Sequence, residues 1–408
     1  MQISVLYIHH CGVFGGASKS LLNMIKGFSK GAVRAYIITP NGSAATKFEE
    51  AGIPTIRARG ISAWGLGKVN RPYGLNYLLI FREIYFSIST LKAILKAKKK
   101  WPDINLVHIN EFPLNLVTIF CKIIFTNKPL IVHARSQQIE KTKAKLYFSI
   151  ISFIHKRCTD VIIAIDKAVK VTLPEDLKTK TIYNGVLLSD LKSKMNEKVF
   201  YRWAKIKKDE IVVGLVANFI IHKGIYEFVE AANICIKKGL KIHFVLVGDN
   251  TRNLRGMKGL ILKKLNLIQD IKSDVKLLVN KYCINRYFHM TGFVYDTQNI
   301  YKKLDILCFP AHGGSVGRPV FEAAFFKVPS IIAANGDIVS DIIEDGITGI
   351  CIPPKDAKSL ADSIEYLYKN PSKRKKMGEE AYKLAMKNFD AKKNAKTVLE
   401  IYKNLINK

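Results

Sequence analysis

A lysine and a glycine-rich loop in the second half of the chain have the residue types that an anionic ligand needs. Lys223 follows a predicted strand, Ile211–Val216, and lies where a predicted helix begins. A lysine there adds its charge to the positive end of the helix, where phosphate groups bind. Residues 313–317 read Gly-Gly-Ser-Val-Gly, and a second predicted helix begins near Pro319. Because small residues let backbone N–H groups approach a diphosphate, the two features together predict a nucleotide site.

A carboxylate follows the glycine-rich loop at helical distance. Glu322 lies one turn into the helix that begins near Pro319. Carboxylates in other nucleotide sites accept hydrogen bonds from ribose hydroxyls, and we expect the same of Glu322. Taken singly, Glu322 is equally compatible with a solvated helix carboxylate, whereas Lys223 alone would more often be an exposed loop lysine.

Two sets of alternating strands and helices must position these residues. The predicted strands are 3–8, 34–38, 106–108, 130–133 and 161–165 in the first half, and 211–216, 242–247, 287–290, 306–309 and 330–333 in the second. Strands that alternate with helices and lack hairpin signals predict parallel, doubly wound sheets. The expected architecture is therefore α/β, with two Rossmann-like domains whose sheets present their carboxyl ends to a shared ligand-binding cleft.

The predicted domains are residues 1–188 and 189–389, joined near the polar stretch Leu187–Asn196. A length of 408 residues suits two α/β domains of about 200 residues each. The final segment, 390–408, holds an amphipathic helix from Ala391 to Ile406. Its apolar side predicts that it packs back on the first domain.

The composition indicates a cytoplasmic protein. The seven cysteines are scattered, odd in number and without metal-site spacing, which favours buried thiols in a reducing compartment. Residues 1–8 lack a basic region and a cleavage site, so we expect a strand there and no signal peptide. No apolar run reaches the ~18 residues of a spanning helix, which predicts a soluble protein.

Ordered motifs along almost the whole chain resemble those of glycosyltransferase family 4, which has the GT-B fold. Residues 15–21, from Gly15 and Gly16 onward, look like the family's first glycine-rich turn, and residues 183–186 match the Asn-Gly-Val that closes its first domain. Asn105-Leu106-Val107-His108 resembles its Asp-x-Val-His strand, with Asn in place of Asp. The remaining matches are Lys223-Gly224 and residues 246–249, 291–294 and 345–349. Each fragment is common, but the ordered set is specific.

The resemblance implies a retaining glycosyltransferase, of hexosyltransferase type, that moves a sugar from a nucleotide-sugar to a lipid-linked or cell-surface glycan acceptor. Its implied donor-binding residues are Gly15, Gly16, Asn218, Gly314, Ser315, Val316, Gly317, Arg318 and Glu322. Two positions depart from the family's pattern. Gly314 replaces a Glu that contacts the donor sugar in most members, and Asn218 replaces an Arg that many members carry. Lys223 is then the main cation beside the leaving phosphate, with Arg318 in the same loop to compensate.

In the family, the first domain also supplies a histidine near the anomeric carbon. His133 ends a strand expected to face the cleft, and the resemblance implies that it is catalytic together with Lys223. His108 ends another strand and is the alternative position. A single histidine at a strand end would otherwise be interpreted as structural.

The implied mechanism follows from the charge that develops on bond breaking. Cleavage at the anomeric carbon leaves positive character on the sugar and negative charge on the diphosphate. Lys223, Arg318 and the loop amides at 314–317 would stabilise that diphosphate. No Asp-x-Asp pair stands at a strand end, so we expect no metal and no cofactor besides the nucleotide-sugar substrate.

The formal charge of +32 indicates an anionic partner or a surface solvated by lysines. Tyr73–Lys100 and Lys141–Arg157 are both apolar and cationic, which suits docking on the acidic inner face of a membrane to reach a lipid-linked acceptor. The alternative is that both are core helices with solvated lysine ends.

Three other functions compete with glycosyl transfer. A sugar-nucleotide epimerase shares the fold but needs a cluster of carboxylates and histidines, which the sequence does not present. A non-catalytic nucleic-acid-binding protein would suit the charge, but the basic residues are dispersed and no such motif is present, so we expect no nucleic-acid partner. A dinucleotide-dependent oxidoreductase would need a Gly-x-Gly-x-x-Gly turn, which neither glycine-rich segment has.

Overall fold

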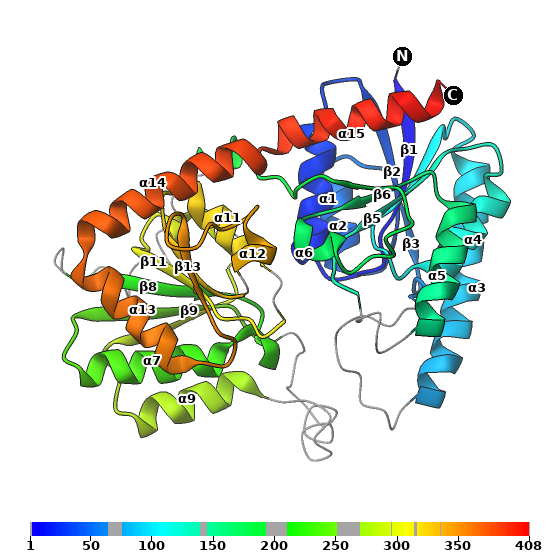
Figure 1. The fold of residues 1–408 in the computed structure, drawn as a ribbon. Coiled ribbons are helices and arrows are strands. Elements are labelled where there is room, and N and C mark those ends of the chain that lie inside the picture. The colour runs from blue at the N-terminus through cyan, green and yellow to red at the C-terminus, as the bar shows by residue number, and fades with distance from the viewer. Residues whose placement is uncertain are drawn as a thin grey trace. The chain divides into compact units, whose positions relative to one another are not determined.

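The computed structural model in Figure 1 describes residues 2–63, 76–138, 145–192, 210–250, 270–294, 296–313, 316–334 and 336–407. The chain forms two compact units. One consists of Met1–Leu187 together with Phe389–Lys408, and the other of Leu188–Asn388. Each unit is an α/β domain built on one parallel sheet, as the sequence predicts.

The described sheet of the first unit has seven parallel strands in the order β3-β2-β1-β4-β5-β6-β7. They are β1 (Ile3–Ile8), β2 (Val33–Pro40), β3 (Thr55–Ala58), β4 (Leu106–Ile109), β5 (Leu130–Ala134), β6 (Val161–Ala164) and β7 (Thr179–Thr181). The five predicted strands of this half are all present. The prediction missed the edge strands β3 and β7, which are short and form no apolar run, reading Thr-Ile-Arg-Ala and Thr-Lys-Thr.

Two layers of helices cover this sheet. The core on one face includes residues of α3 (Asn76–Lys100), α4 (Asn115–Ile124) and α5 (Lys145–Cys158). The core on the other face includes residues of α1 (Gly16–Gly27), α2 (Ser43–Glu50) and α15 (Ala391–Ile406). The short helix α6 (Lys167–Lys170) follows β6.

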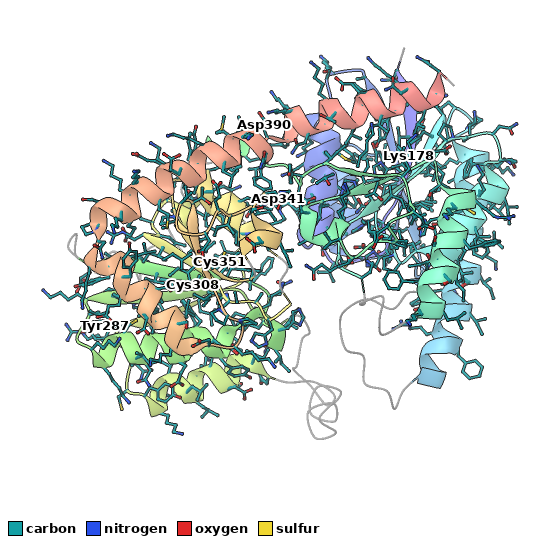
Figure 2. All side chains as sticks on the ribbon, in the orientation of Figure 1. Lys178, Tyr287, Cys308, Asp341, Cys351 and Asp390 are labelled. Atoms are coloured by element: carbon teal, nitrogen blue, oxygen red, sulfur yellow. The ribbon has the colours of Figure 1, made fainter. Side chains whose placement is uncertain are left out.

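The final helix, α15, begins and ends at the residues predicted from the sequence. Asp390, labelled in Figure 2, caps it, because its carboxylate accepts hydrogen bonds from the backbone N–H groups of Lys392 and Lys393. Val398 and Tyr402 of α15 are fully buried beside α1. The last helix of the chain is therefore part of the first unit's core.

The described sheet of the second unit has six parallel strands in the order β10-β9-β8-β11-β12-β13. They are β8 (Ile211–Val216), β9 (Ile242–Val247), β10 (Phe288–Gly292), β11 (Ile306–Phe309), β12 (Ser330–Ala333) and β13 (Gly349–Ile352). Its α-helices are α7 (Ile225–Lys237), α9 (Ile271–Lys281), α10 (Gln298–Tyr301), α11 (Arg318–Ala324), α12 (Gly336–Val339), α13 (Ala357–Lys369) and α14 (Pro371–Asn388). The prediction missed β13, another edge strand with half-buried residues.

The strand orders locate the point in each sheet where ligands bind in doubly wound folds. In the first unit the order reverses between β1 and β4, and in the second it reverses between β8 and β11. Loops after such strands diverge to opposite sides of the sheet and leave a crevice at the carboxyl edge. The candidate residues of each unit should therefore follow these strands.

The cysteines are free thiols, and six of the seven are buried or half-buried, among them Cys308 and Cys351, labelled in Figure 2. Burial raises the pKa of the Cys351 thiol to about 12, which keeps it protonated. Cys283 is the exception to the expectation of buried thiols, because it is exposed. It lies in the turn between α9 and β10, with a positive φ of 56°.

None of the described helices has the length and apolar character needed to cross a bilayer.

Candidate functional site

The loop after β8 is joined closely to the loop after β11. Lys223 ends a short 3-10 turn, Ile221–Lys223, and Gly224 follows with a φ of 71° before α7 begins. A Cβ atom at Gly224 would collide with the carbonyl group of Pro310, so only glycine allows this approach. The N–H of His312 donates to the carbonyl of His222 at 2.9 Å. Both loops thus meet where the strand order of the second unit reverses.

Lys223 is a desolvated cation at this position. Its Nζ lies 5.2 Å from the centre of the Phe309 ring, a cation–π distance. Within the described residues, no carboxylate lies within ion-pair distance of Nζ. Burial lowers the pKa of Lys223 below its ordinary value. A partly buried ammonium without a counter-charge favours an anionic ligand, because the ligand would replace both the lost water and the missing charge.

The end of the glycine-rich loop, at Val316 and Gly317, can be related to Lys223. Gly314 and Ser315 lie outside the described residues. Val316 and Gly317 are half-buried and lead directly into α11, which begins at Arg318. A Cβ atom at Gly317 would collide with the ring of Phe309, the same ring that lies under Lys223. Phe309 therefore holds the end of the loop and the lysine at one place.

Asn218, the other predicted residue of this site, follows Ala217 just after β8. Its side chain is exposed, and the loop carrying it leads to Lys223. The structure thus places Asn218 at the same carboxyl edge of the sheet as Lys223.

Arg318 and Glu322 lie against each other. Arg318 donates from Nε and Nη2 to Glu322 Oε1 at 3.1 and 2.9 Å, and the two side chains are only 9% and 8% exposed. The hydroxyl groups of Tyr301 and Thr297 donate to Glu322 Oε2 at 3.0 and 3.5 Å. A carboxylate has about four acceptor positions, so these four contacts occupy it fully. Arg318, predicted to contact the diphosphate, and Glu322, predicted to contact the ribose, thus form one buried ion pair.

Tyr301 is a member of this cluster that the sequence analysis did not identify. Burial, with the nearby Glu322 carboxylate, raises the pKa of its phenol well above the ordinary value, so the group acts as a neutral donor. Tyr301 ends the four-residue helix α10, and no local pattern connects it with Glu322, 21 residues on. By contrast, the four-residue spacing of Arg318 and Glu322 does indicate their pairing, because residues four apart on a helix are neighbours.

The glycine-rich turn of the first unit opens helix α1. Gly15 is its N-cap and Gly16 its first residue. A Cβ atom at Gly15 would meet no atom within 4 Å, so the position has open space beside the N-terminus of a twelve-residue helix. An anionic or hydroxyl-bearing ligand could approach the backbone N–H groups there.

A polar network follows the central strands of the same unit. The Arg135 guanidinium donates to Asn110 Oδ1 at 2.7 Å and to Asn184 Oδ1 at 2.5 Å. Asn110 Nδ2 lies 2.9 Å from His9 Nδ1, and His9 Nε2 lies 2.8 Å from the Ser18 hydroxyl on α1. The network therefore connects the ends of β1, β4 and β5 to the glycine-rich turn.

His9 and Arg135 are not among the site residues predicted from the sequence. Burial, with His10 and Arg135 nearby, lowers the pKa of His9 well below its ordinary value. Their positions in the sequence could have identified them, because His9 directly follows β1 and Arg135 directly follows β5. A polar side chain at the carboxyl end of a central strand is a candidate for the site even without a motif.

His133 and His108 lie one layer deeper in the same sheet. His133 is 3% exposed and His108 is fully buried. His108 Nε2 lies 3.3 Å from His133 Nδ1, and Arg135 Nη2 lies 3.4 Å from the same atom. Burial, with the positive charge of Arg135, lowers the pKa of His108 to about 3 and that of His133 well below the ordinary value. Both histidines are therefore neutral at physiological pH.

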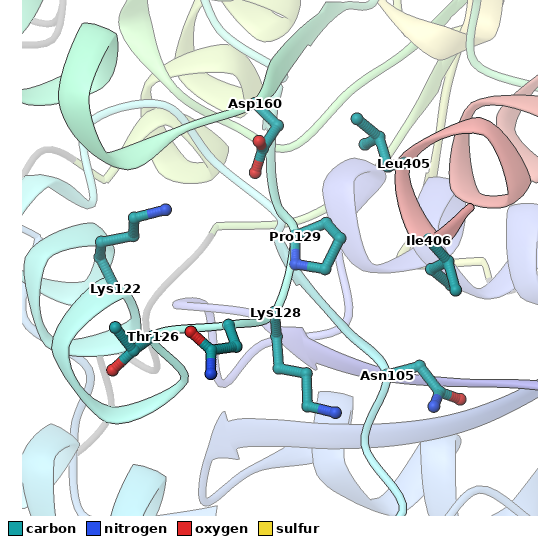
Figure 3. Close-up of a pocket in the computed structure, with 9 residues that line it drawn as sticks. Asn105, Lys122, Thr126, Lys128, Pro129, Asp160, Leu405 and Ile406 are labelled. Atoms are coloured by element: carbon teal, nitrogen blue, oxygen red, sulfur yellow. The ribbon is translucent and has the colours of Figure 1, made fainter. Parts of the chain in front are cut away.

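A pocket of about 420 Å³ lies at the opposite edge of this sheet (Figure 3). Asn105, Pro129 and Asp160 line it, and each directly precedes one of the strands β4, β5 and β6. Lys122 and Lys128 also line it. None of the predicted site residues contributes to this pocket.

The described residues contain no group of three or more His, Cys, Asp or Glu side chains arranged to hold a metal ion. In the described part of the second unit, the Lys223 ammonium and nearby backbone N–H groups could bind a phosphate.

Two family models match the chain, Glycosyltransferase Family 4 over residues 14–190 and Glycosyl transferases group 1 over residues 200–384. The capsular polysaccharide biosynthesis glycosyltransferase CapM of Staphylococcus aureus is 25% identical over 74% of this chain and 77% of its own. The alpha-D-kanosaminyltransferase of Streptomyces kanamyceticus is 23% identical over 48% of this chain, which spans 46% of that relative. The crystal structure of Anabaena HepE in complex with UDP and glucose superimposes with a TM-score of 0.75, covering 99% of this chain and 100% of that one at 17% identity.

Proposed function

The chain belongs to glycosyltransferase family 4, has the GT-B fold and transfers sugars, and on that premise we propose that it moves a sugar, with retention of anomeric configuration, from a nucleotide-sugar to a glycan or lipid-linked acceptor. The observation that carries the proposal is Lys223, a desolvated cation without a described counter-charge at the strand reversal of the second unit. HepE, a structural neighbour, binds UDP and glucose, and CapM acts in capsular polysaccharide biosynthesis, which supports both substrate classes.

Lys223 would stabilise the leaving nucleoside diphosphate. Breaking the bond at the anomeric carbon places negative charge on the diphosphate, and a preorganised cation in a dry site lowers the energy of that state. The N-terminus of α7, a thirteen-residue helix, directly follows Lys223 and adds its positive end. Arg318 is held by Glu322, so Lys223 carries most of this role, with the amides of Val316 and Gly317 beside it.

The Glu322 cluster would bind the nucleoside. A ribose hydroxyl can replace the hydroxyl of Thr297, the longest of the four contacts, without disturbing the ion pair with Arg318. Tyr301 would then keep its hydrogen bond to the same carboxylate oxygen, Oε2. Under this proposal the buried pair orients Glu322 toward the ribose, and Glu322→Ala weakens nucleotide binding more than it slows turnover.

The first unit would contact the transferred sugar and the acceptor. Gly15 leaves space at the N-terminus of α1, and Gly16 is the first residue of that helix. The network of His9, Asn110 and Arg135 connects this turn to His133. We assign His133 to the donor sugar, as the family resemblance implies, through its Nε2 atom.

A panel of nucleotide-sugars tests the function directly. We expect one nucleotide-sugar to raise the thermal unfolding temperature of the full chain, because a ligand at about 100 times its Kd stabilises by about 2.7 kcal/mol. Transfer from that donor to a glycan acceptor should give a product with the anomeric configuration of the donor, measured by proton NMR. Inversion of configuration would disprove retention, and the absence of any stabilising nucleotide-sugar would argue against the donor site.

Turnover should not depend on a divalent metal ion. Because Lys223 supplies positive charge at the diphosphate, we expect transfer to continue in EDTA at a rate within about twofold of the untreated enzyme. The measurement is the initial rate before and after chelation, with a known metal-dependent transferase as the positive control. Activity lost in EDTA and restored by Mg²⁺ or Mn²⁺ would show that a metal takes the role assigned to Lys223.

A membrane surface is the proposed route to a lipid-linked acceptor. The outer sides of α3 and α5 expose large apolar residues, which we call the α3–α5 apolar face: Phe81, Ile84, Tyr85, Ile88, Leu95, Leu146, Ile150 and Phe153. Helices α3 and α5 both pack against α4 on one face of the sheet, as Figure 1 shows. The exposed lysines of α3 are Lys92, Lys96, Lys98, Lys99 and Lys100. Exposed apolar residues beside lysines suit the acidic interface of a bilayer.

Removing the lysines should weaken binding to acidic vesicles. Each contributes about 1 kcal/mol near an acidic surface, so replacing Lys92, Lys96, Lys99 and Lys100 by Gln should reduce partitioning at least roughly tenfold at low salt. Lys98 is kept, because its ammonium donates to the carbonyl of Ile124 and supports the end of α4. Vesicle co-sedimentation with phosphatidylserine measures the effect.

A variant with the same change in charge provides the control for membrane binding. Lys375, Lys376, Lys392 and Lys396 are exposed lysines on α14 and α15, and their replacement by Gln should leave partitioning almost unchanged. Equal losses from both variants would mean that net charge, and not the α3–α5 apolar face, directs binding. Equal binding of the wild type to neutral and acidic vesicles would contradict the electrostatic part of the proposal.

A further inference from the structure

Buried tyrosines and histidines form a hydrogen-bonded ladder across the centre of the first unit's sheet. Tyr7 and His108 are directly paired residues on the neighbouring strands β1 and β4. The hydroxyl of Tyr402, on α15, lies 3.2 Å from the Tyr7 hydroxyl and 2.5 Å from His108 Nδ1. His108 Nε2 lies 3.3 Å from His133 Nδ1. The ladder therefore connects the last helix of the chain to His133.

The contact with Arg135 identifies the direction of every hydrogen bond in the ladder, because a guanidinium can only donate. Its Nη2 lies 3.4 Å from His133 Nδ1, so that nitrogen carries a lone pair and no proton. His108 must then donate from Nε2 to the same lone pair, and two donors sharing one acceptor account for the length of both contacts. The unprotonated Nδ1 of His108 in turn accepts from the hydroxyl of Tyr402. Tyr7 donates to the oxygen of Tyr402.

The proton of His133 is left on its Nε2 atom. A neutral imidazole carries one proton, and Nδ1 already accepts from His108 and Arg135. Nε2 is buried and has no hydrogen-bond partner within the described residues. A buried N–H without an acceptor is unfavourable, and such a group in a native structure calls for a partner such as a ligand atom.

We propose that Tyr402 is a positioning residue, which acts through His108 and together with Arg135 to hold His133 as the Nε2–H tautomer, so that His133 donates a hydrogen bond to an oxygen of the bound nucleotide-sugar. This inference rests on the proposed function for the identity of the ligand. It also assigns the chemistry of His133. With its lone pair at Nδ1 occupied and its proton on Nε2, His133 is a hydrogen-bond donor and not a general base.

The inference is tested by NMR of the full chain labelled with ¹⁵N-histidine. Long-range ¹H–¹⁵N spectra distinguish the two tautomers of each ring, and His108→Gln and His133→Gln assign the signals. We expect both His108 and His133 as Nε2–H tautomers in the wild type at neutral pH. An Nδ1–H tautomer of His133, or a charged ring, would overturn the inference. The spectra need no substrate, so they remain informative if the proposed function is wrong.

Two matched substitutions separate positioning from structural support. Tyr402→Phe removes the donor to His108 and should give a mixture of tautomers at His108, with a fall of about tenfold in kcat/KM for the confirmed nucleotide-sugar, as expected for the loss of roughly one hydrogen bond. Tyr7→Phe removes an equally buried hydroxyl but leaves the Tyr402–His108 hydrogen bond, so the tautomers should stay as in the wild type. The inference fails if Tyr402→Phe leaves both tautomers unchanged, or if Tyr7→Phe alters them equally.

Discussion

Replacing Lys223 by Ala should reduce turnover by roughly 100-fold or more, because a single preorganised group at developing negative charge contributes two to three powers of ten to a rate. The ammonium lies 5.2 Å from the centre of the Phe309 ring, and burial lowers its pKa, so it is already desolvated before the ligand arrives. The free-energy cost of desolvating the ammonium is incurred on folding and is offset when negative charge develops on the diphosphate. The expected loss is therefore in kcat more than in KM. Steady-state kinetics with the confirmed donor measure it.

Lys302 provides a matched control for Lys223. It also belongs to the second unit and also has its ammonium over a phenylalanine ring, 5.9 Å from the centre of Phe326. It lies just after α10 and outside the loops that follow β8 and β11. Lys302→Ala should leave turnover within about twofold of the wild type. Near-normal turnover of Lys223→Ala would refute the assignment of Lys223 to the leaving group.

Most of the fold could be predicted because its central strands are buried on both faces. Strands such as β1 and β8 are fully buried and mostly apolar, and each is followed by a glycine-containing turn and a helix. The missed strands, β3, β7 and β13, lie at the edges of the sheets, where one side is open. β7 reads Thr-Lys-Thr and has no apolar residue, so its place in the sheet depends only on backbone pairing with β6.

The candidate site could be predicted where its residues are close in sequence and not where they meet only in the folded chain. Lys223 and the loop before Arg318 stand out because each follows a recognisable strand. By contrast, Tyr402 and His108 are 294 residues apart, and only the packing of α15 on the sheet brings them together. The resemblance to a family identified His133, but it does not reveal the ladder that determines the proton position on that ring.

The ion pair of Arg318 and Glu322 gives the second large expected effect. Both side chains are more than nine-tenths buried, and Glu322 also accepts from Tyr301 and Thr297. Arg318→Met leaves a buried carboxylate without its cation, which costs about 3–5 kcal/mol of stability in comparable pairs. For a unit of this size we expect the thermal unfolding temperature to fall by roughly 10 °C. Calorimetry of the full chain measures the change.

Two further variants identify the cause of that loss. Adding Glu322→Gln to Arg318→Met removes the unpaired charge but keeps an acceptor for Tyr301, so the double variant should be more stable than the single one. Lys369→Met breaks another pair with four-residue spacing in the same unit, but Lys369 is 62% exposed and its partner Glu365 keeps Lys238, so stability should change by less than about 0.5 kcal/mol. A double variant no more stable than Arg318→Met would mean that lost packing of the arginine, and not the buried charge of Glu322, explains the effect.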